Sequence, residues 1–179
     1  MSITKEKQNN IFDTIKEKLH YSNVSESPKI EKVIVSTGVG SIKDKKKIET
    51  IIDRLTKITG QKPSARPAKK SIATFKLREG DIVGYQVTLR GPRMYDFLDK
   101  LIHVALPRTR DFRGIKVSSI DEMGNISIGV KEHTIFPETS DEDLRDIFGL
   151  NITITTSART KEETEALLRG IQFPLQKRE

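Results

Sequence analysis

Apolar residues that recur three or four positions apart predict helices. This spacing occurs over residues 3–19, 44–58 and 92–105. Ser41 followed by Asp44 predicts the cap of the second helix, and Gly60 is expected to end it. Pro107 is expected to end the third. Two further capping boxes predict short helices before Gly149 and Gly170, and they are formed by Ser140 with Asp143 and by Thr160 with Glu163.

Short runs of β-branched or alternating apolar residues predict strands. These runs cover residues 29–37, 71–78, 82–90, 126–130 and 152–155. The turn at residues 79–81 is expected to join the second and third runs as a hairpin. Hairpins combined with separate helices predict an α+β fold. We expect a single domain, residues 1–179, with a mainly antiparallel sheet and helices packed on one side of it.

Basic and acidic residues are distributed unevenly. The 32 Lys and Arg against 25 Asp and Glu give a net charge of +7. Residues 1–116 hold 25 basic and 13 acidic side chains, whereas residues 117–168 hold 4 basic and 11 acidic. Such asymmetry points to nucleic acid or a membrane surface as the partner of the basic part. The acidic part is either a solvated face or a contact for a basic protein.

One cationic stretch contains no acidic residue. Between Asp53 and Glu79 lie Arg54, Lys57, Lys62, Arg66, Lys69, Lys70, Lys76 and Arg78. Because like charges repel, an acid-free run is costly unless a polyanion neutralises it. The pattern therefore favours a nucleic-acid backbone over an ordinary lysine-rich surface. The apolar residues Ile72 and Phe75 within the run indicate that it is folded.

A second basic cluster consists of Arg108, Arg110 and Arg113, with Asp111 as the acid among them. Arginine binds phosphate with two parallel hydrogen bonds and stacks on bases, so the cluster also favours nucleic acid. The chain has no helix-turn-helix, zinc-finger or basic-zipper pattern, which favours RNA over DNA. Composition alone leaves both open.

The sequence favours no catalytic, metal or cofactor site. The chain has no cysteine, and its three histidines lie far apart without metal-ligand spacing. The glycines at 38 and 40 follow a strand but lack the rest of either nucleotide-binding pattern, which favours a tight turn. The acids at 141–143 fit the first turn of a capped helix. No apolar run is long enough to span a bilayer and no secretory signal is evident, so we expect a cytoplasmic protein.

Several motifs, in order, resemble the bacterial-type large-subunit ribosomal protein L5 family over nearly the whole chain. They are Gly38-Val39-Gly40, Thr59-Gly60-Gln61-Lys62-Pro63, Ala68-Lys69-Lys70-Ser71-Ile72-Ala73, Phe75-Lys76-Leu77-Arg78-Glu79-Gly80, Val87-Thr88-Leu89-Arg90-Gly91, Pro107-Arg108, Arg110-Asp111-Phe112-Arg113-Gly114, Ile135-Phe136-Pro137-Glu138 and Leu150-Asn151-Ile152-Thr153-Ile154-Thr155-Thr156. The chain departs from the family pattern at Ser36, Ser64, Arg66 and Thr74. Ser36 is a shorter hydrogen-bonding arm than the asparagine usual there.

The resemblance implies a structural protein that binds 5S rRNA in the central protuberance of the large subunit, beside other large-subunit RNA and proteins. The residues expected to contact 5S rRNA are Lys32, Ser36, Gln61, Lys62, Thr88 and Arg90. The family also contacts the elbow of the P-site tRNA, and the residues expected at this or another RNA contact are Arg66, Lys69, Lys70, Lys76, Arg78 and Gly80.

The resemblance further implies a bridge to ribosomal protein thirteen of the small-subunit head. The residues expected to form it are Glu138, Asp141, Glu142, Asp143 and Asp146. A free regulatory RNA-binding protein or RNA chaperone is the alternative function. The sequence also leaves open an organellar ribosome of bacterial type.

Overall fold

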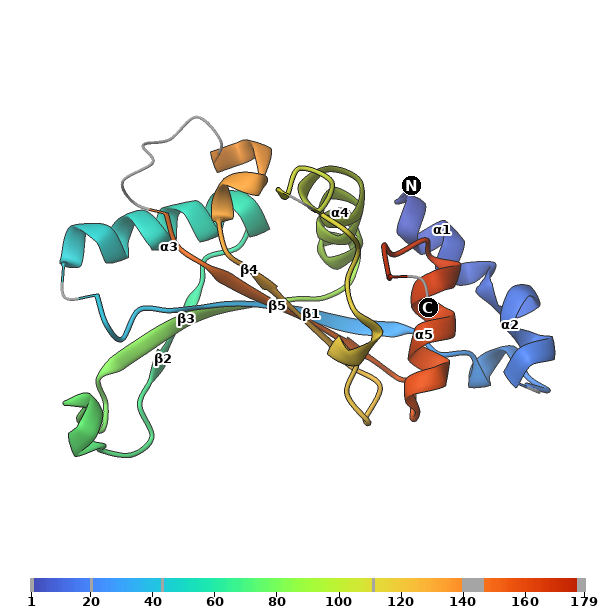
Figure 1. The fold of residues 1–179 in the computed structure, drawn as a ribbon, viewed down its shortest axis with the longest axis horizontal. Helices are drawn as coiled ribbons and strands as arrows, with labels where there is room; N and C mark the ends of the chain where they lie inside the picture. The colour runs from blue at the N-terminus through green and yellow to red at the C-terminus, as the bar shows by residue number, and fades with distance from the viewer. Residues whose placement is uncertain (1, 20, 43, 111, 140–146, 177–179) are drawn as a thin grey trace. The chain divides into compact units, whose positions relative to one another are not determined.

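The computed structural model describes residues 2–19, 21–42, 44–110, 112–139 and 147–176 (Figure 1). Its helices are α1 (Ile3–Asn9), α2 (Ile11–Leu19), α3 (Lys45–Thr59), α4 (Pro92–Lys100) and α5 (Lys161–Gly170). Its strands are β1 (Ile30–Gly38), β2 (Ser64–Pro67), β3 (Ile82–Leu89), β4 (Ile126–Val130) and β5 (Leu150–Thr156). Short single turns of 3₁₀ helix include η2 (Ala73–Phe75), η5 (His133–Ile135) and η6 (Pro137–Thr139).

The strands form one five-stranded sheet in the order β2-β3-β1-β5-β4. Strands β2 and β3 pair antiparallel, with Ser64 opposite Gln86. The Ser157 amide, just after β5, donates to the Lys29 carbonyl just before β1, while the Thr37 hydroxyl near the end of β1 donates to the Gly149 carbonyl. Partners on one strand therefore run backwards along the other, as in an antiparallel pair. These features confirm the α+β prediction.

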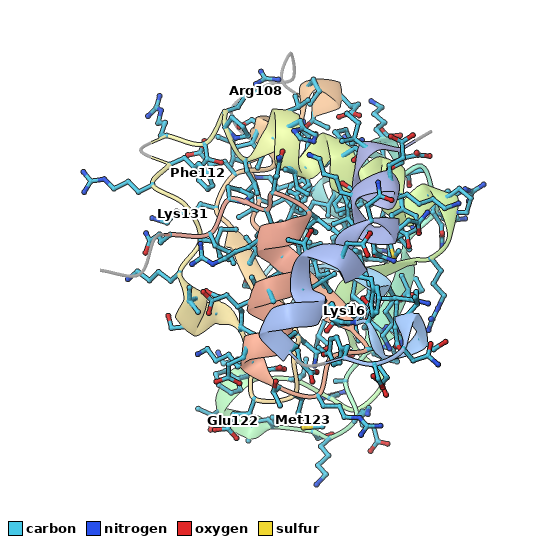
Figure 2. All side chains as sticks on the ribbon, turned by 90° about the vertical axis from the view of Figure 1, so that its right-hand side faces the viewer. Lys16, Arg108, Phe112, Glu122, Met123 and Lys131 are labelled. Carbon is cyan, nitrogen blue, oxygen red and sulfur yellow. The ribbon has the colours of Figure 1, made fainter. Side chains whose placement is uncertain are left out.

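The chain divides into two compact units. Unit 1 contains Met1–Val33, Leu89–Ile128 and Thr153–Glu179, and unit 2 contains Ile34–Thr88 and Gly129–Ile152. Unit 1 holds α1, α2, α4 and α5, and unit 2 holds α3 and the β2–β3 hairpin. Within unit 1, α2 packs on α5, and α1 packs on both α4 and α5. Figure 2 shows α5 beside the two N-terminal helices.

The first turn of α1 is held by a carboxylate from α4. Asp99 accepts hydrogen bonds from the hydroxyls of Ser2 (2.6 Å) and Thr4 (2.5 Å). It also accepts from the backbone amides of Ile3 (3.0 Å) and Thr4 (2.9 Å). Burial alone would raise the pKa of this carboxyl, but the four hydrogen bonds to its charged form lower it overall. Asp99 thus satisfies amides that the start of a helix leaves unpaired.

Two details of the sequence prediction need correction. The predicted strand 71–78 is wrong, because the partner of β3 is β2 and the stretch 71–78 contains the single turn η2. The side chains of that stretch are mostly exposed, so its apolar residues do not mark a buried strand face. The cap of α3 is Asp44, whose carboxylate accepts from the Lys46 amide at 3.0 Å, and Gly60 ends the helix at φ +67° as predicted. Strand β2 carries a proline, which an edge strand tolerates.

The other predicted helices that lie within the described residues are present in the structure. Thr160 caps α5 by accepting from the Glu163 amide, and α5 ends at Gly170 as predicted. The helix predicted over 92–105 begins as α4 and continues as the π-helical turn η3 (Leu101–Ala105). The stretch predicted as one helix over 3–19 forms α1 and α2, with a break at Asn10. The predicted helix capped by Ser140 and Asp143 lies mostly outside the described residues.

Candidate RNA interface

The segment joining β2 to β3, residues 68–81, is an ordered loop, here called the hairpin tip (Figure 1). The backbones of Ile72 and Leu77 exchange two hydrogen bonds of 3.0 and 3.1 Å. The Ser71 hydroxyl accepts from the Glu79 amide, and the Asp81 carboxylate accepts from the Arg78 amide, both at 2.9 Å. At its base, the Ala68 amide donates to the Asp81 carbonyl at 2.8 Å. The tip therefore has a defined backbone although it lies at the surface.

Cationic side chains cover the hairpin tip and the strand that leads to it. All of those predicted there are exposed, namely Arg66, Lys69, Lys70, Lys76 and Arg78. Lys76 adopts a left-handed backbone at φ +52°, and its amide donates to the Ala73 carbonyl at 3.0 Å. Gly80 has φ +92°, a conformation that glycine adopts without strain. The structure thus brings together the residues that the sequence grouped for tRNA or other RNA.

Two members of the acid-free stretch do not belong to this surface. Arg54 is 4% exposed, and its guanidinium donates to Nε2 of the buried His133 at 3.2 Å. The His133 ring stacks on Phe148 with 4.2 Å between ring centroids. Lys57 lies one turn along α3 from Asp53, and the two form an ion pair of 2.9 Å. The acid-free stretch therefore does not act as one surface, because Arg54 and Lys57 have partners within the fold.

Strands β1 and β3 each have a buried side and a half-exposed side. On β1, Val35 and Thr37 are buried while Ser36 is half-exposed. On β3, Val87 is buried while Thr88 is half-exposed. We define the open face as the less buried side of β1, β3 and β5 within unit 2. It carries Ser36, Gln86 and Thr88, which are half-exposed, and Asn151, which is exposed. The Ser36 hydroxyl donates to the Asn151 carbonyl at 3.5 Å, so its other hydrogen-bonding capacity faces outward.

Gln61 and Lys62 lie at the start of the chain segment that enters β2. Because β2 runs antiparallel to β3, this segment lies beside the C-terminal half of β3, where Thr88 stands. Gln61 is half-buried, and its backbone carbonyl accepts a hydrogen bond from the Thr59 hydroxyl at 3.1 Å. Lys62 is exposed. Unit 2 therefore gathers four of the six residues expected at 5S rRNA: Ser36, Gln61, Lys62 and Thr88.

The other two of the six belong to unit 1. Lys32 is half-buried on β1, on the same side of that strand as Ser36 by alternation. Arg90 is exposed and follows β3 directly.

The second basic cluster lies on the loop between η3 and residue 116 in unit 1. Arg108, Arg110 and Arg113 are exposed, and Figure 2 shows Arg108 and Phe112 on this loop. The loop is anchored by Ile115, whose amide donates to the Pro174 carbonyl at 2.8 Å and whose carbonyl accepts from the Gln176 amide at 2.9 Å. Three arginines are thus presented to solvent from a fixed base.

The predicted acidic contact is only partly visible. Glu138 is exposed in η6, whereas Asp141, Glu142, Asp143 and Asp146 lie outside the described residues. Among the residues that the structure does describe, no group of three or more metal-ligating side chains is found. In the same part of the chain, no helix is long and apolar enough to cross a membrane.

Sequence reasoning missed the exposure of the apolar residues in the hairpin tip and at the start of β3. Phe75 is 75% exposed, Ile82 49% and Ile72 42%. The loop that carries them is folded, as the sequence indicates, but these side chains face solvent among cations. A signal is present in the sequence, because 71–78 lacks the strict alternation that residues 83–89 show.

Comparison with known proteins identifies the family. The family model of ribosomal protein L5 matches residues 23–78, and the model of the C-terminus of the same ribosomal family matches residues 82–175. The chain belongs to the ribosomal protein L5 family. The large ribosomal subunit protein uL5 of Ureaplasma urealyticum is 46% identical over 171 residues, which cover 95% of this chain and 93% of the relative.

Two other members of the L5 family, also named uL5, match this chain at similar identity and coverage. The uL5 of Nitrosomonas europaea is 51% identical over 88% of this chain and 89% of its own length. The uL5 of Mycoplasma capricolum is 50% identical over 89% of both. These relatives are named as proteins of the large ribosomal subunit, and the L5 family to which the chain belongs is not a family of enzymes, as expected.

Proposed function

We propose that this member of the L5 family is a structural constituent of the large ribosomal subunit in the cytoplasm, where it binds 5S rRNA. The observation that carries the proposal is the open face of unit 2, a row of half-exposed hydroxyl and amide side chains beside exposed cations. The names of the relatives support the assignment to the large subunit.

The chemistry of the open face and of the adjoining Gln61 and Lys62 suits RNA. Gln61 and Thr88 offer neutral donors and acceptors, which can pair with ribose hydroxyls and base edges. Lys62 supplies charge for the phosphate backbone, and we add Lys32 and Arg90 to this role. Ser36 reaches less far than an asparagine would, so it contacts RNA only where the backbone approaches β1 closely.

We also propose a P-site tRNA contact at the hairpin tip and a protein bridge at the acidic residues. The tip projects exposed Lys76 and Arg78 from a fixed backbone, which suits an RNA brought from outside. The acidic set Glu138, Asp141, Glu142, Asp143 and Asp146 is suited to a basic partner, ribosomal protein thirteen of the small-subunit head. Charges at the rim of such an interface mainly change its rate of association and its salt dependence.

A filter-binding titration of 5S rRNA tests the main proposal. Gln61→Ala is expected to weaken binding by about 1–3 kcal/mol, the cost of leaving a buried partner unpaired. Gln176→Ala is the matched control, because Gln176 is also a half-buried glutamine. Its hydrogen bond to Ile115 is made by the backbone amide, which the substitution keeps. Equal affinities for the two variants would remove Gln61 from the site.

Sedimentation separates this function from that of a free regulator or chaperone. A large-subunit constituent co-sediments with the large subunit, whereas a free RNA-binding protein stays in the soluble pool. For the bridge, reversing Asp141, Glu142 and Asp146 to lysine is expected to slow subunit joining at low salt while 5S rRNA incorporation stays normal. Unchanged joining would make the acidic set a solvated face.

A further inference from the structure

The hairpin tip presents an aromatic ring to solvent. Phe75 is 75% exposed, and the apolar Ile72 and Ile82 on the same hairpin are 42% and 49% exposed. Scattered exposed apolar residues are ordinary, but several at one end of a hairpin mark a contact surface. In the described residues, the only other large apolar side chain exposed as fully as Phe75 is Met123, at 74%.

The ring is carried on a backbone that is already ordered. Phe75 ends the turn η2, which lies between the paired backbones of Ile72 and Leu77. The Lys76 amide closes the turn on the Ala73 carbonyl at 3.0 Å. Holding the loop in one conformation before binding reduces the entropy lost on association. The exposure of Phe75 is therefore a property of a fixed loop.

The charges around the ring indicate the chemistry of the partner. Lys69, Lys70, Lys76 and Arg78 are exposed in the same loop. The loop carries two acids, so its cations outnumber its acids by four to two. Glu79 is exposed, and the Asp81 carboxylate accepts a hydrogen bond from the Arg78 amide within the loop. An aromatic ring among cations suits a flat apolar group attached to a polyanion. An unpaired base with its phosphates has this chemistry.

We propose that Phe75 stacks on an unpaired base of the RNA that the hairpin tip binds, while the neighbouring cations hold the flanking phosphates. This rests on the proposed RNA contact of the tip and adds a preference to it. RNA with an accessible base is bound in preference to a continuous duplex, whose bases are already stacked on one another.

The test uses two RNA probes that differ in one nucleotide: a duplex of about 20 base pairs and the same duplex with a single bulged base. Phe75→Ala is expected to weaken binding of the bulged probe by about 5- to 150-fold, the range for loss of one base stack, and to leave binding of the plain duplex nearly unchanged. Because stacking involves no counterion release, the slope of affinity against salt should stay constant. Met123→Ala is the matched control, since it removes an equally exposed apolar side chain.

Phe75→Trp supplies an independent readout. The chain has no tryptophan, so this variant carries a single indole whose fluorescence reports its surroundings. Stacking on a base is expected to quench that fluorescence on addition of the bulged probe, with affinity kept near that of the wild type.

The outcomes distinguish this inference from the proposed function. Loss of binding in Lys76→Ala with Arg78→Ala, but none in Phe75→Ala, would overturn the stacking and leave the RNA contact standing. No loss in either variant would overturn both. Unquenched indole fluorescence in Phe75→Trp would also overturn the stacking. Loss of binding to anionic lipid vesicles in Phe75→Ala, with RNA binding unchanged, would assign the ring to a membrane surface instead.

Discussion

Two regions of unit 2 use cationic side chains in opposite ways: the hairpin tip, and the interior around Arg54. Arg54 is 4% exposed and its guanidinium donates to His133, so its charge is used within the fold. Arg78 is exposed, and what holds its position is a backbone hydrogen bond to Asp81. The cations of the tip are exposed, and the proposed RNA contact would use them. Within one acid-free stretch, the buried Arg54 serves the fold, whereas the exposed cations of the tip form the proposed binding group.

The largest expected effect comes from breaking the interior contact. Arg54→Met should lower the free energy of unfolding by about 1–3 kcal/mol, because it leaves the buried His133 nitrogen without that donor. Lys57→Met is the control on the same helix, and loss of its exposed ion pair should cost about 0.5 kcal/mol or less. Urea unfolding measures both. Equal costs would mean that Arg54 behaves as a surface residue.

A second effect of similar size on the free energy of unfolding is expected where β1 and β3 pack closely in unit 2. Added at Gly84, a Cβ would lie 2.7 Å from the Thr37 carbonyl oxygen, whereas at Gly38 it would meet no atom within 4 Å. Gly84→Ala is therefore expected to cost about 1–3 kcal/mol of unfolding free energy, and Gly38→Ala much less. If both variants melt at the same temperature, β1 and β3 do not approach as closely as described.

A smaller effect is expected at Asp99 in unit 1, where an acid acts within the fold. Asp99→Asn should cost about 1 kcal/mol at neutral pH, the usual value of a helix cap. Because folding lowers the pKa of this carboxyl, its contribution is present above the ordinary carboxyl pKa of about 4 and is lost as pH falls through the lower folded value. The difference between the wild type and Asp99→Asn should therefore shrink below about pH 4.

Unfolding curves at several pH values measure the Asp99 difference. Asp96→Asn, an exposed position on the same helix, serves as the control. A difference that stays constant from neutral pH down to about pH 3 would show that the Asp99 carboxylate charge is not what holds α1.

The sequence was enough to predict the fold class, because alternating and helical spacing directly reflect burial. It was also enough to place the C-terminal end of α3 at Gly60 and the start of α5 at Thr160, since both residues act locally. Periodicity could not identify the partner of β3, because β2 is a four-residue exposed edge strand with no apolar alternation. Pairing of such a strand depends on backbone hydrogen bonds across 14 intervening residues.

For the candidate site, sequence identified the cations of the hairpin tip but not which cations are buried. Arg54 and Lys57 carry the same formal charge as Lys76, and only the packing of α3 shows that Arg54 is used internally. The convergence of Gln61 with Thr88 was expected from resemblance, and the antiparallel pairing of β2 with β3 supplies a physical reason for it. The exposure of Phe75 could not be predicted from the sequence, because it depends on the backbone conformation of the loop.

Measuring two variants against two RNAs tests the central claim most directly. The claim is that the open face and the hairpin tip are separate RNA contacts, one for 5S rRNA and one for tRNA. Gln61→Ala should weaken 5S rRNA binding and leave tRNA binding unchanged. Lys76→Ala with Arg78→Ala should do the reverse and lower the salt slope of tRNA binding by about one unit for each phosphate that the protein no longer neutralises. Equal losses of affinity for both RNAs in both variants would contradict this separation.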